Sequence, residues 1–280
     1  MNIGIIGQGY VGKNLADFFE HNNYDIVRYS LEKEYVDNLK QISNCSIVFI
    51  AVPTPTINNV CDLSIVEEAL ILLKEGTTAV IKSTLIPNSV TKLQVKFPKI
   101  KIFYSPEFLR QKKAKYDTLH PKRNIIGIPI NSDEYYELAK KIISILPKSK
   151  TEIITDSTSA ELIKYISNFY FVMKSVYMNI FYDFSKLHDG NWNDILDGIT
   201  SDPRIGKSHT KIFSDKGRGA GGNCLIKDSE ALISYLKETM DSNHLLLLES
   251  IKNLNLDFLY NSKKDLDILS KIYGKKENYK

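Results

Sequence analysis

The sequence lacks the features that would place a protein in a membrane, on nucleic acid or outside the cell. No apolar run approaches the roughly 20 residues that cross a bilayer, and the opening, MNIGIIGQGYVG, is too short and glycine-rich for a signal peptide. No charge dominates, since 37 basic residues are scattered among 33 acidic ones, which excludes a concentrated nucleic-acid footprint. The three cysteines have no disulfide-framework spacing. We therefore expect a cytoplasmic protein with no membrane, nucleic-acid or metal partner.

What is present is an ordinary globular composition, with 43% hydrophobic and 25% charged residues in a chain of 280. This length permits one large domain or two smaller ones. Strands alternate with helices in the first half and helices alone follow. We therefore predict an NAD(P)-binding Rossmann-like domain at residues 1–154 and a helical central domain at residues 155–261. The Lys- and Asn-rich remainder, residues 262–280, is predicted to be a frayed or surface tail.

The chain opens with a dinucleotide-binding pattern. A short strand-forming run, Asn2–Ile6, leads at once into Gly7-Gln8-Gly9-Tyr10-Val11-Gly12 and an amphipathic stretch. In G-x-G-x-x-G the glycines allow a tight turn, close approach of a pyrophosphate and close helix–strand packing. The free N–H groups at the helix start then bind the phosphates. The candidate cofactor-binding residues are Gly7, Gly9, Tyr10, Val11 and Gly12.

The second predicted strand, residues 24–29, ends where this fold normally places a carboxylate for the ribose hydroxyls. Ser30 occupies that position and is a candidate cofactor contact, with Arg28 two residues before it. A serine with an arginine could accommodate the 2′-phosphate of NADP, whereas Glu32 could supply the carboxylate for NAD. The sequence predicts NAD and leaves NADP open.

Polar motifs follow successive strands of the first half. The apolar run SIVFIAV predicts a buried parallel strand at residues 46–52, and Pro53 and Thr54 come directly after it. Further strands are predicted at residues 78–81, 102–104 and 124–128. Strands alternating with helices indicate a doubly wound parallel sheet, in which ligands bind at the carboxyl ends of the strands. Pro53, Thr54 and Thr84 are therefore candidate cofactor contacts.

Residues 157–187 are strongly periodic and predict one long helix, with Ser157 or Thr158 as its N-cap. The segment is rich in aromatic residues and apolar on most sides, which is typical of a central core helix. Its extra apolar width also indicates a homodimer contact. Lys164 and Asn168 are spaced i and i+4, so they project from one face. A buried lysine and amide are costly unless they are paired or bind a ligand.

A glycine-rich stretch, residues 217–228, reads GRGAGGNCLIKD and presents one cysteine. Its glycines permit positive φ angles and close approach of a ligand. Cys224 has Lys227 and Asp228 nearby and precedes a helix predicted at residues 228–238; both a cationic neighbour and a helix start favour the thiolate. The pattern therefore predicts a nucleophile, although a lone cysteine is more often buried and structural. A further helix is predicted at residues 244–260.

Seven motifs follow one another along the chain: GQGYVG, FIAVPTPT, IKST, YSPEFL, AELIKYISN, DPRIG and GGNCLIKD. In this order the chain resembles the UDP-glucose/GDP-mannose dehydrogenase family from Met1 to roughly Tyr235. The resemblance implies an NAD-dependent enzyme of polysaccharide biosynthesis. It would oxidise the C6 hydroxymethyl group of a nucleotide sugar to a carboxylate in two hydride transfers.

The resemblance also assigns roles to the candidate catalytic residues. Lys164 and Asn168 would stabilise the oxyanion that develops during the first oxidation. Cys224 would add to the resulting aldehyde and form a thiohemiacetal, whose oxidation gives a thioester. Asp228 and Glu107 would then serve as acid/base groups in thioester hydrolysis.

Further residues are assigned by the same resemblance. Thr84 would position the hydrolytic water, Lys227 would contact the cofactor, and Arg204 would reach the substrate from the neighbouring subunit of a homodimer. The implied substrate-binding residues are Glu107, Phe108, Leu109, Lys164, Asn168, Arg204 and Gly221.

The sequence departs from the family pattern at several positions. Gln111 replaces an acidic residue, Lys112 replaces a glycine and Ile226 replaces a proline. Ala220 replaces an aromatic residue, which removes a wall from the sugar pocket. Family members also continue into a third domain that grips the nucleotide, whereas these 280 residues end after the central helices. The nucleotide would then be held differently, or the substrate would be smaller or otherwise activated.

Two other hypotheses fit the sequence. A single-step dehydrogenase of the β-hydroxyacid type resembles this chain in size, in its first domain and in a Lys and Asn on the central helix, but it needs no thiol at Cys224. A catalytically inactive cofactor-binding derivative of the family is the second alternative, against which the retained Lys164, Asn168 and Asp228 argue.

Overall fold

The computed structural model describes residues 2–57, 60–214 and 217–274, which divide into two compact units. Unit 1 comprises residues 1–55 and 61–164, and unit 2 comprises residues 56–60 and 165–280. The division therefore falls inside the long helix at residues 157–187, ten residues beyond the domain boundary predicted at residue 154.

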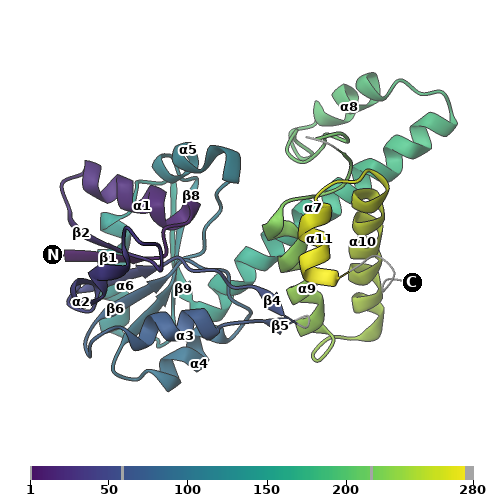
Figure 1. Ribbon diagram of the computed structural model, residues 1–280. Helices are drawn as coiled ribbons and strands as arrows, with labels where there is room; N and C mark the ends of the chain where they lie inside the picture. Colours follow the sequence, from purple (N-terminus) through teal and green to yellow (C-terminus); the bar gives the residue numbers. More distant parts are fainter. Residues whose placement is uncertain (1, 58–59, 215–216, 275–280) are drawn as a thin grey trace. The chain divides into compact units, whose positions relative to one another are not determined.

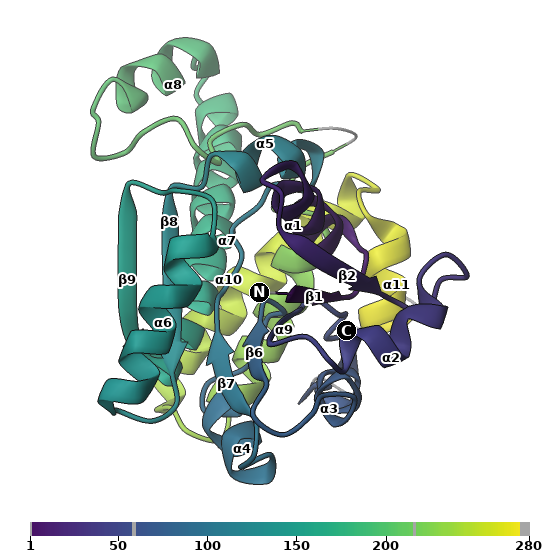
Figure 2. The ribbon, with the colours of Figure 1, turned by 90° about the vertical axis from the view of Figure 1, so that its left-hand side faces the viewer.

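Unit 1 is built on a seven-stranded sheet with the order β2-β1-β3-β6-β7-β8-β9. Figure 2 labels β9, β8, β7, β6, β1 and β2 of this sheet. The strands are β1 (Asn2–Ile6), β2 (Asp25–Tyr29), β3 (Ile47–Ile50), β6 (Thr78–Ile81), β7 (Lys101–Tyr104), β8 (Arg123–Ile128) and β9 (Thr151–Asp156). The first five pair in parallel, which confirms the doubly wound prediction. One difference is that β8 pairs antiparallel with β7 while β9 runs parallel to β8, because apolar content encodes the burial of a strand and not its direction.

Helices cover both faces of this sheet (Figure 1). The helices of unit 1 that precede the long helix are α1 (Tyr10–His21), α2 (Leu39–Ile42), α3 (Ser64–Ile71), α4 (Ser89–Lys96), α5 (Ala114–Leu119) and α6 (Asp133–Ile145). On one face, α1 and α6 pack on β-strand residues such as Phe49 and Phe103. On the other face, α3 and α4 pack on residues such as Ile81 and Tyr104. All four of these side chains are fully buried, and burial of Phe49, Phe103 and Ile81 stabilises the fold by about 1.5–3 kcal/mol each.

The long helix α7 spans Ser157–Leu187, the bounds that its periodicity predicts. Its first turn is capped by the residue before it, since the Asp156 carboxylate accepts the Ser159 N–H at 2.8 Å and the Ser159 hydroxyl at 2.6 Å. The cap is therefore an aspartate, and the prediction of Ser157 or Thr158 was wrong. Aspartate suits the position because its charge complements the helix dipole.

Unit 2 contains a small hairpin and the remaining helices. Its elements are β4 (Thr56–Ile57) with the first residue of β5 (Val60–Cys61), α8 (Trp192–Thr200), α9 (Asn223–Leu236), α10 (Ser242–Asn261) and α11 (Leu266–Tyr273). Ile226 of α9, Leu259 of α10 and Leu269 of α11 form one buried cluster. Because α9 begins at Asn223, Cys224 lies in the first turn of this helix and does not precede it.

Residues 262–274, which follow α10, do not form the frayed tail that the sequence predicted. Lys264 is 6% exposed, Leu269 is fully buried, and Tyr273, one turn later on the same face of α11, is buried as well. The helical signal was present in the sequence, because Leu266, Leu269 and Tyr273 recur at spacings of three and four residues, but the charged end of the chain outweighed it in the prediction. The end of the predicted tail, residues 275–280, lies outside the described residues.

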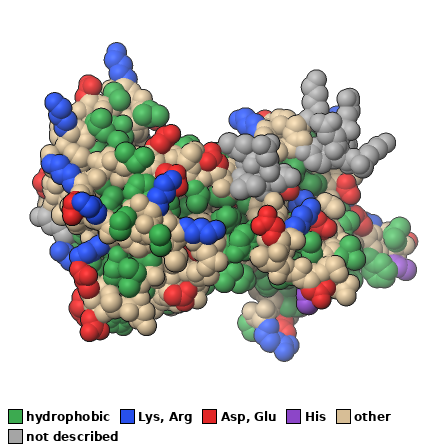
Figure 3. Space-filling model, turned by 90° about the horizontal axis from the view of Figure 1, so that it is seen from below, with side chains coloured by type: hydrophobic (Ala, Val, Ile, Leu, Met, Phe, Trp, Pro, Cys, Tyr) green, Lys and Arg blue, Asp and Glu red, His purple; other side chains and the backbone are tan. Residues whose placement is uncertain are grey.

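Charged side chains of both signs are interspersed on the face drawn in Figure 3. In the described part of the chain, no helix is both long enough and apolar enough to span a membrane. The same residues contain no group of three or more His, Cys, Asp or Glu side chains that could hold a metal ion.

Candidate active site

The turn between β1 and α1 has the geometry of a dinucleotide site. Gly9 is the N-cap of α1 and no side chain caps this helix start, so its N–H groups are open to a phosphate. A Cβ at Gly12 would overlap the carbonyl oxygen of Gly7, which is why glycine is required there. Tyr10 and Val11 form the first turn of the helix. These residues fit the pyrophosphate of a dinucleotide.

The end of β2 favours NAD over NADP. Arg28 Nε donates to Glu20 at 2.9 Å and Arg28 Nη2 donates to Asp17 at 2.5 Å. Both carboxylates lie on α1, so the guanidinium that could have bound a 2′-phosphate is already paired with two acidic groups. Ser30 is half-buried at the strand end, and its hydroxyl accepts the Glu32 N–H at 3.3 Å.

Glu107, after β7, is held by a lysine that the sequence analysis did not assign to the site. Lys82 Nζ lies 2.9 Å from Glu107 Oε2 and donates to the Ser105 hydroxyl at 3.1 Å. The Lys82 side chain is only 6% exposed, so its charge needs this carboxylate. The other oxygen of Glu107 accepts the Phe108 N–H at 3.1 Å. The IKST motif at the end of β6 was the signal that could have identified Lys82.

Lys164 lies beside the same strand end. Its Nζ donates to the Glu107 carbonyl oxygen at 2.5 Å and lies 5.4 Å from the centre of the Phe108 ring. Lys164 is buried, and it lies on the second turn of α7. Unit 1 therefore brings together Glu107, Phe108 and Lys164, three of the residues predicted for the site.

The start of α7 is anchored on α4 by Glu161, whose role the sequence analysis missed. Its fully buried carboxylate accepts the N–H groups of Asn88 at 2.7 Å and Val90 at 2.8 Å, at the start of α4. Burial raises the pKa of Glu161 to about 7, although these backbone hydrogen bonds lower it. Because Lys164 follows one turn later, this anchor helps to hold Lys164 in place.

A second group of candidate residues lies in unit 2. Asn168 Nδ2 donates to Asp228 Oδ2 at 2.7 Å, and Lys227 Nζ lies 2.6 Å from Asp228 Oδ1. Asp228 is 1% exposed and Asn168 is buried too, so each oxygen of a buried carboxylate has a donor. The predicted cofactor contact Lys227 is thus paired with its neighbour.

Cys224 is half-buried in the first turn of α9. Asp228 follows four residues later, so the thiol and the carboxylate lie one turn apart on the same side of the helix. Thr56, the last residue of the FIAVPTPT motif, donates from Oγ1 to the Lys227 carbonyl at 3.3 Å and ties β4 to this turn. No disulfide joins Cys224 to Cys45 or Cys61, all three being in the described part of the chain.

The other predicted site residues differ in how far they are exposed to solvent. Arg204 is 88% exposed at its side chain and pairs with Asp202 at 2.5 Å. Thr54 is buried and Pro53 is exposed after β3. The half-buried residues among the predictions are Thr84, Leu109 and Gly221.

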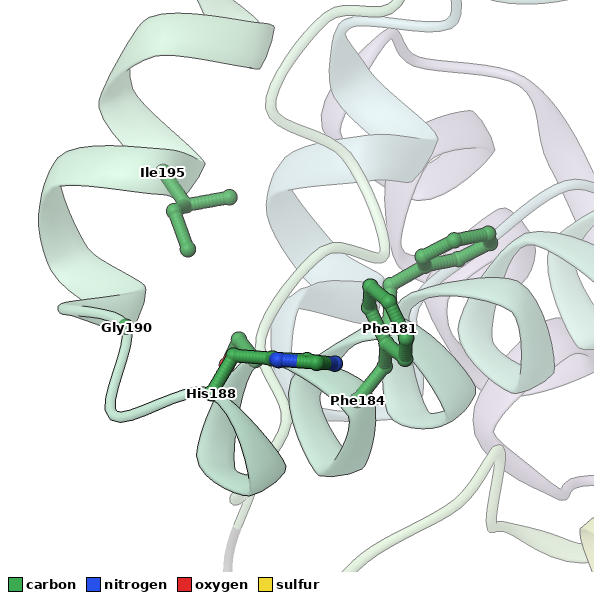
Figure 4. A pocket seen from close by; sticks show the side chains of 6 residues that line it. Phe181, Phe184, His188, Gly190 and Ile195 are labelled. Atoms are coloured by element: carbon green, nitrogen blue, oxygen red, sulfur yellow. The ribbon is translucent and has the colours of Figure 1, made fainter.

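A separate hollow of about 410 Å³ lies between the end of α7 and α8 in unit 2 (Figure 4). Phe181, Phe184 and His188 line it on one side and Ile195 on the other. Its lining is almost wholly apolar and contains none of the predicted site residues.

The chain is similar to known proteins of one family. Residues 36–147 match the NAD-binding domain of the UDP-glucose/GDP-mannose dehydrogenase family, and residues 158–256 match its central domain. A UDP-glucose 6-dehydrogenase of Campylobacter jejuni is 30% identical over 311 residues, which cover 91% of this chain and 76% of that protein. One of Rickettsia bellii is 31% identical over 288 residues, which cover 88% of this chain and 65% of that protein.

The chain thus spans less than two thirds of the length of the Rickettsia bellii relative. Among solved structures, a UDP-glucose dehydrogenase from Pyrobaculum islandicum has a similar fold, with a TM-score of 0.80 at 21% identity. This similarity covers 98% of this chain and 71% of that structure.

Proposed function

Because the chain belongs to the UDP-glucose/GDP-mannose dehydrogenase family, we propose that it oxidises the C6 hydroxymethyl group of a nucleotide sugar to a carboxylate. The observation that carries this proposal is the start of α9, where Cys224 and Asp228 lie one turn apart and the carboxylate is bound to Asn168. A nucleophile beside an oriented acid/base group is what capture and release of an aldehyde require.

In the proposed reaction, the residues of this chain would have separate roles. NAD, held by the β1–α1 turn, supplies the acceptor for one hydride in each of two oxidations. The ammonium of Lys164 and the amide of Asn168, one turn apart on α7, stabilise the alkoxide that forms when the C6 hydroxyl loses its proton. Cys224 Sγ then bonds to the aldehyde carbon, and the thiol proton ends on the hydroxyl oxygen of the thiohemiacetal.

The second oxidation removes hydride from C6 and the hydroxyl proton, which leaves a thioester on Cys224. Water, positioned by Thr84, adds to the thioester carbon while Glu107 or Asp228 takes its proton. The carbon–sulfur bond breaks, the thiol regains a proton and the carboxylate leaves. Both carboxylates already have a donor on each oxygen, but Glu107 is the more accessible base, because it is half-exposed whereas Asp228 is buried.

The test measures how many NAD molecules are reduced for each sugar molecule consumed, from the absorbance of the reduced cofactor. The substrates are a panel of UDP- and GDP-sugars, and NADP is tested in parallel with NAD. Two per sugar with NAD is expected for the wild type. Cys224→Ser should release aldehyde and reduce no more than one, while Cys61→Ser, at a buried thiol, should retain two. One NAD per substrate, unaffected by Cys224→Ser, would favour the single-step β-hydroxyacid alternative. No reduction with any sugar would favour the catalytically inactive derivative.

The proposal includes a homodimer through α7. Nine apolar side chains of this helix are more than a third exposed, and seven of them recur at alternating spacings of four and three residues, the period of a helix-pairing seam. These seven are Ile166, Tyr170, Met173, Tyr177, Ile180, Phe184 and Leu187. Arg204, exposed after α8, would then act on the partner's substrate.

The predicted cytoplasmic location stays a prediction.

Light scattering after gel filtration tests this seam. Tyr177→Glu should convert the wild-type dimer to a monomer, because it places a charge in the middle of the apolar seam. Lys186→Glu, an exposed position outside the seam, is the matched control and should stay dimeric. A monomeric wild type at micromolar concentration would overturn the proposed dimer.

A further inference from the structure

The glycine-rich loop before Cys224, Gly217–Gly222, is bound by side chains from the end of α10 and the turn after it. These residues, which we call the C-terminal clamp, are Asn255, Ser262, Lys264 and Asp265. Asn255 Oδ1 accepts the Ala220 N–H at 2.7 Å, and Asn255 Nδ2 donates to the Ala220 carbonyl at 3.0 Å. One side chain thus pairs with both backbone groups of Ala220.

Lys264 and Asp265 bind the loop on either side of Gly221. Lys264 Nζ donates to the Gly219 carbonyl at 2.8 Å, and the Gly222 N–H donates to Asp265 Oδ2 at 2.7 Å. A Cβ at Gly221 would overlap the Asp265 carboxylate and the Lys264 side chain, so a larger residue here would displace both side chains from the loop. The clamp therefore packs directly against the loop backbone at Gly221.

Arg218 ties the same loop to α7. Its Nε donates to Asn179 Oδ1 at 2.9 Å and its Nη2 donates to Asp183 Oδ2 at 2.8 Å. Its backbone N–H donates to the Ser262 hydroxyl of the clamp at 2.8 Å. The loop is therefore held from two sides before it enters α9.

We propose that the C-terminal clamp positions Cys224 for its reaction, with Asp265 and Lys264 as positioning residues; this inference rests on the proposed function. Gly222 is the N-cap of α9 and Cys224 lies two residues later, so fixing the Gly222 N–H fixes the helix start that presents the thiol. A covalent catalyst needs this precision, since a small misplacement of the nucleophile slows reaction strongly. The family match ends at residue 256, so the role of Lys264 and Asp265 follows from the structure alone.

Amide hydrogen exchange of the full-length chain tests the clamp without reference to activity. Asp265→Gly removes the carboxylate and tolerates the φ of 53° at this position. It should speed exchange in peptides spanning residues 217–228 by about 10- to 100-fold, as expected for loss of a charge-assisted hydrogen bond. Asp265→Asn, which keeps an acceptor, should restore most of the protection. Asp267→Gly, on the exposed side of α11, is the matched control and should change exchange by less than about threefold.

Alkylation of Cys224 by iodoacetamide, followed by peptide mass spectrometry, gives the positioning readout. Cys45 and Cys61 are 2% and 7% exposed, and burial raises the pKa of Cys45 to about 11, so Cys224 should be the main site labelled at neutral pH. Because the start of a helix promotes cysteine reactivity, Asp265→Gly should slow alkylation at least about threefold, and Asp267→Gly should not.

Steady-state kinetics then separate positioning from mere folding. Asp265→Gly should lower kcat at least about tenfold and leave the KM for NAD unchanged, because the dinucleotide motif lies in unit 1. Unchanged loop exchange in Asp265→Gly would refute the clamp. Faster exchange with unchanged alkylation and unchanged kcat would refute its positioning role. If the wild type oxidises no sugar, the proposed function fails, while exchange and alkylation still decide whether the clamp positions the thiol.

Discussion

The buried carboxylate of Glu161 makes the stability of unit 1 depend on pH in an unusual direction. Its pKa is raised by burial from an ordinary 4.5 to about 7, so the folded chain binds a proton that the unfolded chain releases between these values. Folding is therefore stabilised fully below pH 4.5, and this contribution is lost as the pH rises through 7. At about 1.36 kcal/mol per pKa unit, the loss amounts to about 3 kcal/mol.

The substitution Glu161→Gln isolates this contribution, because glutamine has the shape of the protonated acid and does not titrate. Urea unfolding at pH 5 and pH 8 gives the free energy of unfolding of both proteins. The amide nitrogen of glutamine replaces one oxygen that accepts a backbone N–H, which costs stability equally at both pH values. We therefore expect the stability of Glu161→Gln relative to the wild type to rise by about 2.5 kcal/mol from pH 5 to pH 8. Glu137→Gln, at an exposed glutamate of α6, is the control and should leave the difference between the two pH values unchanged.

Two outcomes would refute this reasoning. Parallel pH dependences of the wild type and Glu161→Gln would show that the carboxyl group titrates at its ordinary pKa in the folded chain. A wild type that gains stability over Glu161→Gln as the pH rises would show a lowered pKa. In that case the N–H groups of Asn88 and Val90, which favour the charged form, outweigh the effect of burial.

Three further predictions concern the candidate site. Gly12→Ala should weaken NAD binding about 10- to 100-fold in a calorimetric titration, because its Cβ would overlap the Gly7 carbonyl; an unchanged Kd would contradict this. Lys82→Gln should lower kcat about 100-fold at an unchanged KM for NAD, since Glu107 loses its ion-pair partner, and Lys82→Arg should retain more activity; equal rates in both variants would argue against a role for the charge. Asn168→Ala should lower the free energy of unfolding by about 1–3 kcal/mol in urea, because buried Asp228 loses a donor, and an unshifted midpoint would count against the hydrogen bond.

Much of the fold could be predicted because it depends on local patterns. The strand β6 and the helix α7 have the bounds that apolar runs and helical periodicity indicate. The turn after β1 carries a motif whose glycines have a direct steric reason, as the overlap at Gly12 shows. In contrast, β9 was missed because only two of its six residues, Ile153 and Ile154, are apolar and none is buried, and α11 was missed because its short apolar pattern lies beside the charged end of the chain.

By itself, the sequence determined which chemical groups this protein carries and roughly where they lie along the chain: a thiol at a helix start, a lysine and an amide one turn apart, and a dinucleotide motif. Only the tertiary structure decided which groups pair. Glu161 binds a backbone N–H 71 residues away, Asp265 binds one 43 residues away, and Lys82 meets Glu107 across two strand ends. The physical reason is that such partners are selected by packing, since a buried polar group must take whatever donor or acceptor the fold brings beside it.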